Sequence, residues 1–318
     1  MSRHPEIDLK AVRTIPVESR PTKVRVEQFA PAPDPAATVG SFEQFLPDIL
    51  VGTALREFIQ AWVVARAEGR PAVAMLGGHV MKTGVQRPLL ALLDSGAFTA
   101  VALNGAAAIH DFEIALWGQT SEPVEETLGT GQFGLVEETP SLMNQAVNEG
   151  VKRGLGMGEA LGEFLNEADA PHASLSVLAR AATLGVPLTV HVAIGTDTVH
   201  QHPSFDGAAT GLATHRDFRI FAAALRHLEG GAVLNFGSAV VLPEVFLKAL
   251  STVRNLGHDA GRFTAANFDQ IRHYRPEKNI LERPLLAGGK GHSFVGPHEI
   301  WIPLIAALYL ARADQPGP

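Results

Sequence analysis

Short apolar runs alternate with amphipathic segments along most of this chain. The runs at residues 73–76 and 100–103 each end in a turn of small or polar residues, and the segment 86–94 between them is helix-like. The order strand, turn, helix, strand, turn, helix over residues 73–116 is typical of a parallel sheet wound on both faces by helices. The pattern therefore predicts an α/β fold that binds ligands at the carboxyl ends of its strands.

The rest of the chain extends this pattern into one predicted domain. Apolar residues at spacings of three and four begin near Ser41. We expect a Rossmann-like, doubly wound sheet of about five or six mostly parallel strands over residues 41–318. Residues 1–40 are proline-rich, which predicts an arm that lies on the surface or on a partner subunit. Further strands are predicted at 186–195, 232–236 and 262–267, and helices at 137–165 with a break at 154–158, at 174–183, at 217–228, from 243, and at 300–311.

Composition narrows the classes of protein. A chain of 318 residues that is 46% hydrophobic can bury one large core. A net charge of -7 and the lack of long basic runs argue against a nucleic-acid partner. The absence of cysteine excludes disulfides, thiolate metal ligands and cysteine nucleophiles. No apolar run reaches the ~18 residues of a membrane helix, and the polar start of the chain does not resemble a signal peptide. We therefore expect a cytoplasmic protein with no membrane partner.

Small residues close four of the predicted strands, and they mark the candidate site. The one GxGxxG match, GTGQFG at 129–134, lies in a predicted loop and does not link a strand to a helix, and GxxxxGK[ST] is absent. A nucleotide would therefore be held by the backbone at the strand tips and by an acidic residue that binds ribose. Asp197 and Asp269 are placed best for that role. The tips are Gly77-Gly78, Asn104-Gly105, Gly195-Thr196-Asp197 and Gly237-Ser238.

Histidines supply the candidate acid–base chemistry. His191, His200 and His202 lie close to Asp197 in the sequence, which indicates either a metal site or a polar active-site loop, and we favour the loop without metal. His200 and His202 would face the same side of an extended segment. His110 and Asp111 are expected at a helix start, where Asp111 would complement the helix dipole. His191 or His110 is the expected general base, because imidazole titrates near neutrality.

Five blocks of the sequence resemble, in order, the deoxyhypusine synthase family. The resemblance implies a Rossmann-like, NAD-binding subunit, usually in a homotetramer with active sites between subunits. It also implies oxidation of spermidine with NAD and transfer of the aminobutyl group through a lysine imine to a protein lysine or a free polyamine. The blocks are LGGHVMKTGVQRPLLALLDSGAFTAVALNGAAAIHDFEIAL (76–116), VPLTVHVAIGTD (186–197), LNFGSAVVLPEVFLKAL (234–250), FTAANFDQIRHYRPEKNI (263–280) and HEIWIPLIAAL (298–308).

By this resemblance, NAD contacts fall on a defined set of residues. Gly77 and Gly78 are added to the set because they close an earlier strand in the same way. The implied contacts are Asn104, Gly105, Asp197, Gly237, Ser238, Asp269, His298 and Glu299.

The segment that should carry the family's chemistry departs from its pattern. The Trp-Gly-Lys sequence is missing, which leaves Lys278 and Lys290 as the candidates for the imine lysine. The histidine of the family's KH segment is replaced by the region around Glu244, which becomes a catalytic candidate in its place. A loop with Arg272, His273 and Arg275 would repel a polycation and suit an anionic substrate. These three residues, with Glu277, His200 and His202, are the predicted substrate-binding residues.

Four functions follow for this sequence. The first is an NAD-dependent enzyme that acts on another small substrate by hydride transfer, without an imine lysine. The second is a true deoxyhypusine or homospermidine synthase, which needs Lys278 or Lys290 as nucleophile. The third is a metal-dependent hydrolase or lyase that uses the 191–206 cluster. The fourth is a ligand-binding relative without activity.

Overall fold

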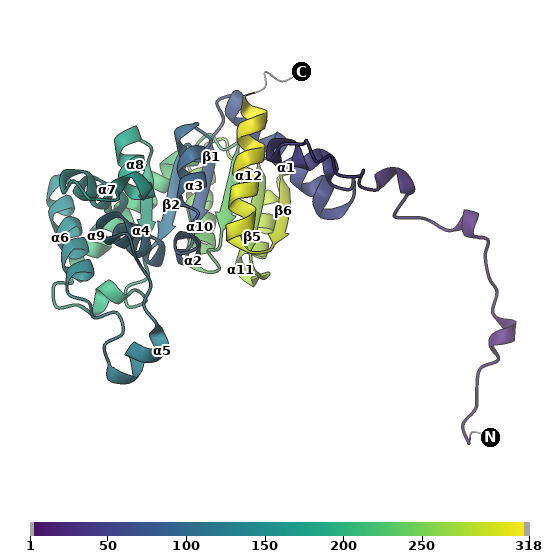
Figure 1. Ribbon diagram of the computed structural model, residues 1–318, viewed down its shortest axis with the longest axis horizontal. Helices are drawn as coiled ribbons and strands as arrows, with labels where there is room; N and C mark the ends of the chain where they lie inside the picture. Colours follow the sequence, from purple (N-terminus) through teal and green to yellow (C-terminus); the bar gives the residue numbers. More distant parts are fainter. Residues whose placement is uncertain (1–2, 315–318) are drawn as a thin grey trace.

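A single parallel sheet forms the centre of the molecule. The computed structural model describes residues 3–314, and within them six strands lie in the order β3-β2-β1-β4-β5-β6, every neighbouring pair parallel (Figure 1). This confirms the predicted Rossmann-like α/β class. The strands are β1 Ala72–Leu76, β2 Ala100–Asn104, β3 Leu188–His191, β4 Ala232–Phe236, β5 Thr264–Asp269 and β6 Lys290–Val295.

Helices connect the strands and also form most of the surface. The longer helices are α1 Leu50–Ala67, α3 Gln86–Asp94, α4 Gly105–Trp117, α6 Glu138–Arg153, α7 Met157–Glu167, α8 Val177–Leu184, α9 Gly207–Ala224, α10 Val241–Asn255 and α12 His298–Ala313. The short ones are α2 Gly78–Met81, α5 Val124–Thr127, α11 Tyr274–Pro276, the π-helical η8 Glu277–Glu282, and the 3-10 turns η1 Leu9–Ala11, η2 Val17–Ser19, η3 Val26–Gln28, η4 Val39–Phe45, η5 Leu128–Thr130, η6 Ala173–Leu175, η7 Thr198–Gln201 and η9 Arg283–Leu285. In the described part of the chain, no helix combines the length and the hydrophobicity that crossing a bilayer requires.

The strands alternate between two apolar cores. In β1, Ala72, Ala74 and Leu76 face a core built with α1, α3, α4, α8 and α12, whereas Val73 and Met75 face α9, α10 and η8. All five residues of β1 are buried, as expected for a central strand covered on both faces. The sheet is therefore the middle of three layers, and only its two ends are open to ligands.

The strand order reverses direction between β1 and β4. From β1 the chain continues outward to β2 and β3, then crosses back to β4 and continues to β5 and β6 on the other side. The helices that follow β1 and β4 therefore leave on opposite faces, and in folds of this strand order ligands bind in the crevice at this switch point.

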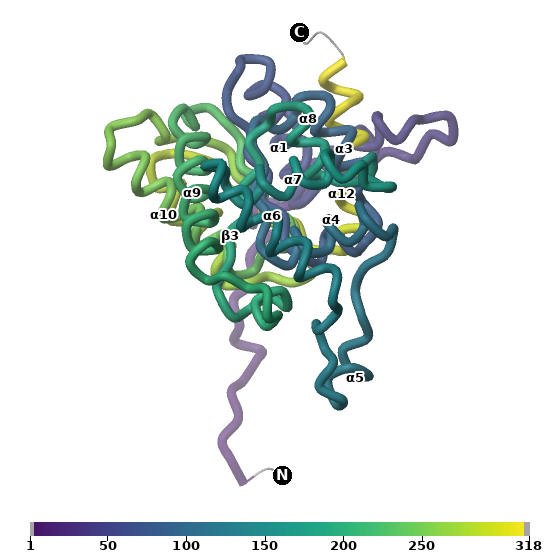
Figure 2. The backbone as a smooth tube through the Cα atoms, turned by 90° about the vertical axis from the view of Figure 1, so that its left-hand side faces the viewer, coloured from purple at the N-terminus to yellow at the C-terminus, as the bar shows by residue number. Residues whose placement is uncertain are grey.

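Two segments project from the layered body. Residues 3–38 run away from it as an extended arm with short turns, and the loop that carries α5 extends below α4 and α6 (Figures 1 and 2). Ile7, Leu9, Val26 and Phe29 in the arm are each more than 60% exposed.

Several element boundaries differ from the predicted ones for physical reasons. The ladder of β3 ends at His191, four residues before the predicted end, because the chain turns away to Gly195, which has φ of 98°. Helix α9 begins at Gly207, ten residues early, because Asp206 caps it by accepting from the amides of Ala208 and Ala209.

The predicted helix start at His110-Asp111 is wrong. Helix α4 begins at Gly105, capped by Asn104, and Asp111 lies fully buried in the middle of it. Its carboxylate accepts from the Ser176 hydroxyl and from the amides of Val177 and Leu178, so it caps the start of α8 instead of its own helix.

Candidate active site

The tips of β1 and β4 touch backbone to backbone. The amide of Gly77 donates to the carbonyl of Phe236, and a Cβ on Gly77 would lie 2.2 Å from the Gly237 carbonyl oxygen. Gly237 has φ of 63°, and a Cβ there would lie 2.6 Å from Nε2 of His298. Only glycine fits at either position, which keeps the two tips close at the floor of the crevice.

Two side chains beside these tips are buried with unsatisfied polar atoms. His298, the first residue of α12, is fully buried, and neither ring nitrogen has a hydrogen-bond partner among the described residues. Asp269, the last residue of β5, uses Oδ1 to accept from the Gln270 amide, while its buried Oδ2 has no hydrogen bond. Unsatisfied buried groups of this kind cost stability, and they are common where a ligand supplies the missing partner.

His79 joins this crevice to the neighbouring strand tips. Its ring centre is 5.8 Å from that of His298, and its Nε2 lies 2.7 Å from the side-chain nitrogen Nε2 of Gln270. Gly78 at the start of α2 packs against α4, where a Cβ would lie 2.7 Å from Cβ of Ala106. The short helix α2 thus links the β1–β4 crevice to the tip of β2.

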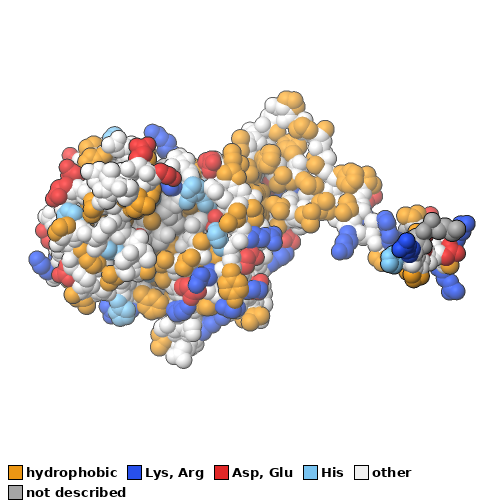
Figure 3. Space-filling view, turned by 90° about the horizontal axis from the view of Figure 1, so that it is seen from below, with side chains coloured by type: hydrophobic (Ala, Val, Ile, Leu, Met, Phe, Trp, Pro, Cys, Tyr) orange, Lys and Arg blue, Asp and Glu red, His pale blue; other side chains and the backbone are white. Residues whose placement is uncertain are grey.

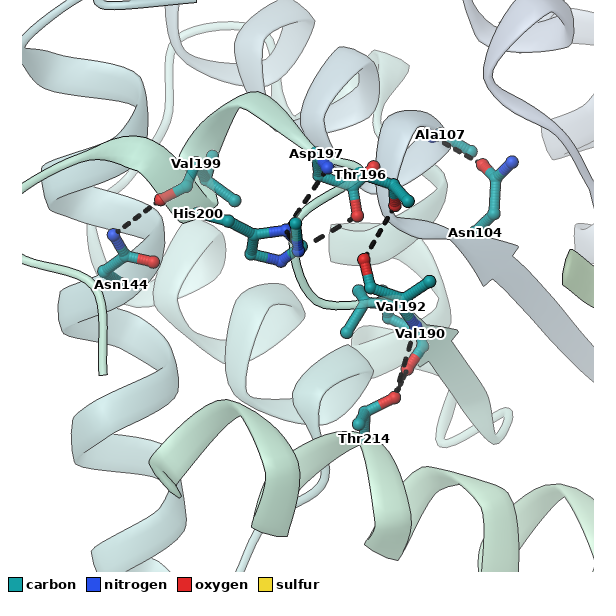
Figure 4. A network of polar contacts seen from close by, with 12 residues as sticks. Asn104, Ala107, Asn144, Val190, Val192, Thr196, Asp197, Val199, His200 and Thr214 are labelled. Atoms are coloured by element: carbon teal, nitrogen blue, oxygen red, sulfur yellow. Dashed lines mark hydrogen bonds and ion pairs between the residues drawn. The ribbon is translucent and has the colours of Figure 1, made fainter. Parts of the chain in front are cut away.

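Asp197 reaches from the loop after β3 to the tip of β2. A Cβ on Gly105 would lie 2.0 Å from Oδ2 of Asp197, and that buried oxygen has no hydrogen-bond partner in the described chain. Burial raises the pKa of Asp197 to about 6. Nδ1 of His200 accepts from the amides of Gly195 and Asp197, and its Nε2 is 3.9 Å from Oδ2 of Asp197 (Figure 4). Burial lowers the pKa of His200, so this ring is neutral at pH 7 and does not compensate the carboxylate.

A cavity of about 720 Å³ opens beside Asp197, between α4, α6 and the loop that carries α5. It is lined by the side chains of Lys82, His110, Glu113, Thr120 and Asp197, with Trp117 on its apolar wall. The pKa of His110 is lowered to about 4, mainly because the ring is buried and further because Lys82 and His79 lie near it. His110 is therefore a neutral imidazole at pH 7, and a neutral imidazole can accept a proton.

The other histidines of the 191–206 cluster lie in separate environments. His191 is buried against Phe221 with Nε2 3.0 Å from Oγ1 of Thr189, and burial lowers its pKa to about 3. His202 contacts Ser204 through Nδ1 and Glu137 through Nε2 at 3.5 Å. Residues 198–201 form a 3-10 turn, so the extended segment expected for His200 and His202 is not formed. Within residues 3–314, no three histidine or acidic side chains converge as a metal site would require.

The predicted catalytic lysines lie in surface ion pairs outside the cavity. Nζ of Lys278 is 2.5 Å from Oε2 of Glu282, and Nζ of Lys290 is 2.6 Å from Oε2 of Glu57. Lys290 is the first residue of β6 and pairs in register with Thr264, so it lies at the amino edge of the sheet, opposite the strand tips.

The remaining predicted residues form a polar group around α11 and η8. Oε1 of Glu244 accepts from the Asn279 amide and lies 3.2 Å from Nε of Arg275, and Oε1 of Glu277 accepts from Ser293. His273 is 3.8 Å from Oδ2 of Asp269, and so it is the member of this group nearest to the crevice. Arg272 is exposed, and so is Glu299 in the first turn of α12. Seen from the carboxyl edge of the sheet, the molecule shows histidines among mixed acidic and basic side chains (Figure 3).

Some residues of the cavity were not predicted. Lys82, Glu113 and Thr120 come from three different segments, and only the fold brings them beside His110. The spacing of His110 and Glu113, three residues apart on one helix, is the one sequence signal that points to a shared face. Ser238, predicted at the cofactor, is buried and holds the first turn of α10 by accepting from the Leu242 amide.

Comparison with known proteins gives similarity at the level of the fold. No protein-family model and no curated protein sequence matches the chain. Unliganded AgrE superimposes with a TM-score of 0.51 and 14% identity over 81% of this chain and 32% of AgrE. The chain thus spans about a third of the length of AgrE.

Two other solved structures have lower scores. A "conserved putative LOR/SDH protein" from Methanococcus maripaludis gives a TM-score of 0.49 at 13% identity, over 87% of this chain and 71% of that one. A "putative deoxyhypusine synthase" from Entamoeba histolytica gives 0.43 at 11% identity, over 76% and 75%. Scores this low do not assign the chain to either family.

Proposed function

We propose that this protein is an NAD-dependent enzyme that transfers hydride between the cofactor and a small substrate in the cavity beside Asp197. The observation that carries the proposal is the reversal of strand order between β1 and β4, together with two buried carboxylates at the carboxyl ends of the strands, Asp197 and Asp269, each with an unbonded oxygen. Dinucleotides bind at this switch point in sheets of this strand order. AgrE, which shares the fold, has a solved ternary complex with ornithine and NAD+.

The residues at the crevice fit a dinucleotide. Gly77 and Gly237 let the two strand tips pack directly against each other and against His298, which keeps the backbone at the switch point free of side chains of its own. Asp197 lies against the tip of β2, and its unbonded oxygen is available to accept from a ribose hydroxyl. Asp269 and His298 offer an acceptor and ring nitrogens on the other side of the switch point. When bound, NAD+ would accept a hydride from a substrate carbon.

His110 is the residue of this chain best placed for the accompanying proton. It lines the cavity, is neutral at pH 7, and lies near His79, which in turn contacts His298. His191, the other predicted base, is buried at the end of β3 and does not line the cavity. We therefore assign proton transfer to His110.

The alternatives that were open from the sequence have less support. Aminobutyl transfer through the lysines predicted for it needs Lys278 or Lys290 at the site, and both are ion-paired outside the cavity. A metal-dependent reaction needs the histidines of the 191–206 cluster to converge, and each has its own separate contacts. A protein that binds a ligand without turnover would use the same crevice. Formation of reduced cofactor in the presence of a substrate would distinguish an enzyme from such a protein.

Calorimetric titration with NAD+ tests the proposal. The wild type should bind, and Asp197→Asn and Asp269→Asn should each weaken binding by about tenfold or more, because a hydrogen bond to a charged group is worth ~1.5–3 kcal/mol. Asp94→Asn is the matched control, since Asp94 ends α3 in a surface pair with Arg180 at the opposite edge of the sheet.

The same titration can contradict the proposal. Absence of NAD+ binding by the folded wild type would overturn it. Normal affinity in both Asp197→Asn and Asp269→Asn would remove the two carboxylates from the site.

A further inference from the structure

A chain of hydrogen bonds along one wall of the cavity joins three segments of the fold. Nδ1 of His110 lies 2.7 Å from Oγ1 of Thr120, and the Thr120 hydroxyl donates to Oε2 of Glu113. The other oxygen of Glu113 accepts from the Thr139 hydroxyl at 3.0 Å. His110 and Glu113 share a face of α4, Thr120 follows α4 in the loop, and Thr139 belongs to α6.

The direction of these hydrogen bonds determines which ring nitrogen of His110 is protonated. A threonine hydroxyl has one proton to donate, and that of Thr120 goes to the Glu113 carboxylate. Toward His110, Oγ1 of Thr120 can therefore only accept, so Nδ1 must carry the ring proton. In a neutral imidazole the other nitrogen, Nε2, is then an acceptor.

We propose that Glu113 and Thr120 are positioning residues that fix His110 in the Nδ1–H tautomer and present its bare Nε2 to the cavity as the proton acceptor. This inference rests on the proposed function for the identity of the reaction, but the tautomer itself does not. Nε2 makes no hydrogen bond among the described residues, so it is free for a ligand.

The groups that face His110 favour this arrangement. Lys82 and His79 approach from the α2 side, and together with burial they keep the ring uncharged at pH 7. Glu113 is held by two hydroxyls from different segments, so its carboxylate cannot rotate toward the ring without breaking both bonds. The remaining acids of the cavity wall are Asp197, Glu122 and Glu138. Glu122 is held away by accepting from the Gly134 amide.

The proton step balances with the hydride step. A substrate with a hydroxyl or amine on the reacting carbon loses its O–H or N–H proton to Nε2 of His110. The same carbon gives its hydrogen with two electrons to NAD+, and a C=O or C=N bond forms. The imidazolium that results can pass its proton on when product leaves.

Histidine-selective ¹⁵N NMR of the full chain tests the inference without any substrate. The His110 signals are identified by their loss in His110→Gln. Long-range proton–nitrogen couplings then report which ring nitrogen is protonated between pH 6 and 8. In the wild type we expect the Nδ1–H form to exceed the Nε2–H form by about tenfold or more, since a single hydrogen bond can bias two tautomers by that factor.

Substitutions of Thr120 test whether its hydroxyl, and not the packing of its side chain, sets the tautomer of His110. Thr120→Val should reduce the excess of the Nδ1–H form to about twofold or less, whereas Thr120→Ser keeps a hydroxyl and should preserve it. Thr130→Val is the matched control, because Thr130 lies in the same projecting loop and its hydroxyl bonds only Thr127 and Gln132 there.

Failure of the inference can be told from failure of the proposed function. If the wild-type His110 ring carries its proton on Nε2, or if the tautomer is unchanged in folded Thr120→Val, the positioning role of Thr120 and Glu113 is overturned, even if NAD+ binds. If the ring carries its proton on Nδ1 and responds to Thr120→Val, the positioning role is supported, even if NAD+ does not bind. The calorimetric result then removes only the hydride reaction.

Discussion

Two buried carboxylates of the candidate site differ from the buried carboxylate of Asp111 in their hydrogen bonds. Asp111 is fully buried and all of its bonds are made within the fold, while Oδ2 of Asp197 and of Asp269 lack any hydrogen bond in the described chain. Because an unsatisfied buried group costs folding free energy, its retention is easiest to explain by a ligand. At the scale of single residues, the unbonded oxygens of Asp197 and Asp269 therefore lower the stability of the folded protein.

Asp197→Asn should make the protein more stable above pH 6. The pKa of about 6 in the folded state lies above the ordinary aspartate value of 3.8, so the folded chain binds this proton more tightly than the unfolded chain. The free energy of unfolding contributed by Asp197 therefore falls as pH rises from about 4 to about 6 and is constant above that. The variant should gain up to about 3 kcal/mol at pH 7.5 and only about 0.5 kcal/mol at pH 4, since one pKa unit corresponds to ~1.4 kcal/mol.

Urea unfolding of wild type and variant at pH 4 and 7.5 measures this difference. Asp94→Asn, which changes an exposed carboxylate, should follow the wild type at both values. Equal unfolding free energies for wild type and Asp197→Asn at pH 7.5 would contradict the buried, uncompensated carboxylate.

Helix ends couple elements that are distant in the sequence. The carboxylate of Asp111 on α4 caps α8, 65 residues further along for the Ser176 contact, and His172 donates its amide to Ala115 in the same region. The cap thus attaches α8 to the helix that carries His110 and Glu113. The positions of these two cavity residues depend on this attachment.

Asp111→Ala should destabilise the protein strongly. It leaves the Ser176 hydroxyl and two backbone amides buried without an acceptor, a loss of about 3 kcal/mol or more. Thermal and urea unfolding measure the effect, and Asp111→Asn, which keeps one acceptor oxygen, should lose less. A change below about 1 kcal/mol in Asp111→Ala would show that α8 does not need this cap.

The local pattern of apolar residues predicted the elements with a clear periodicity. It missed features that depend on residues distant in the sequence. Helix Gln86–Asp94 and strand Ala232–Phe236 were predicted with the observed bounds, because their apolar residues have one clear periodicity. Strand Lys290–Val295 was not predicted, since this edge strand is only partly buried and its inner positions are His292 and Phe294. The cap by Asp111 was also out of reach, because its partners lie 65 to 67 residues away.

At the scale of the whole molecule, the amino-terminal arm exposes apolar side chains that the contacts within one chain leave uncovered. Its apolar residues Ile7, Leu9, Val26 and Phe29 are exposed, and an apolar hollow lined by Leu46, Leu50, Trp301 and Leu304 lies near its base. Residues 1–30 hold six basic and four acidic side chains, against a net charge of -7 for the full chain. We propose that the arm packs on a second copy of the chain, while residues 41–318 form the α/β domain.

Removal of residues 2–30 should lower the oligomeric state. Burial of the exposed apolar side chains of the arm on a second copy would stabilise that contact, at ~25 cal/mol per Å². Light scattering coupled to size exclusion should show an oligomer for the full chain and a smaller species for the truncated one. Ile7→Ser with Leu9→Ser keeps the length of the arm and should weaken association in the same direction. Identical masses for the full and truncated chains would contradict the proposal.

The sequence alone determined the class of fold and the edge of the sheet at which the proposed site lies. Apolar runs closed by Gly77, Gly105 and Gly237 require strands that end in close backbone approaches, and this information is local. The tertiary structure decided which side chains meet there. Asp197 against the β2 tip, and Thr120 between His110 and Glu113, depend on strand order and loop paths that no local pattern encodes. It also placed Lys278 and Lys290 in ion pairs outside the cavity, because their position follows from the packing of η8 and the register of β6.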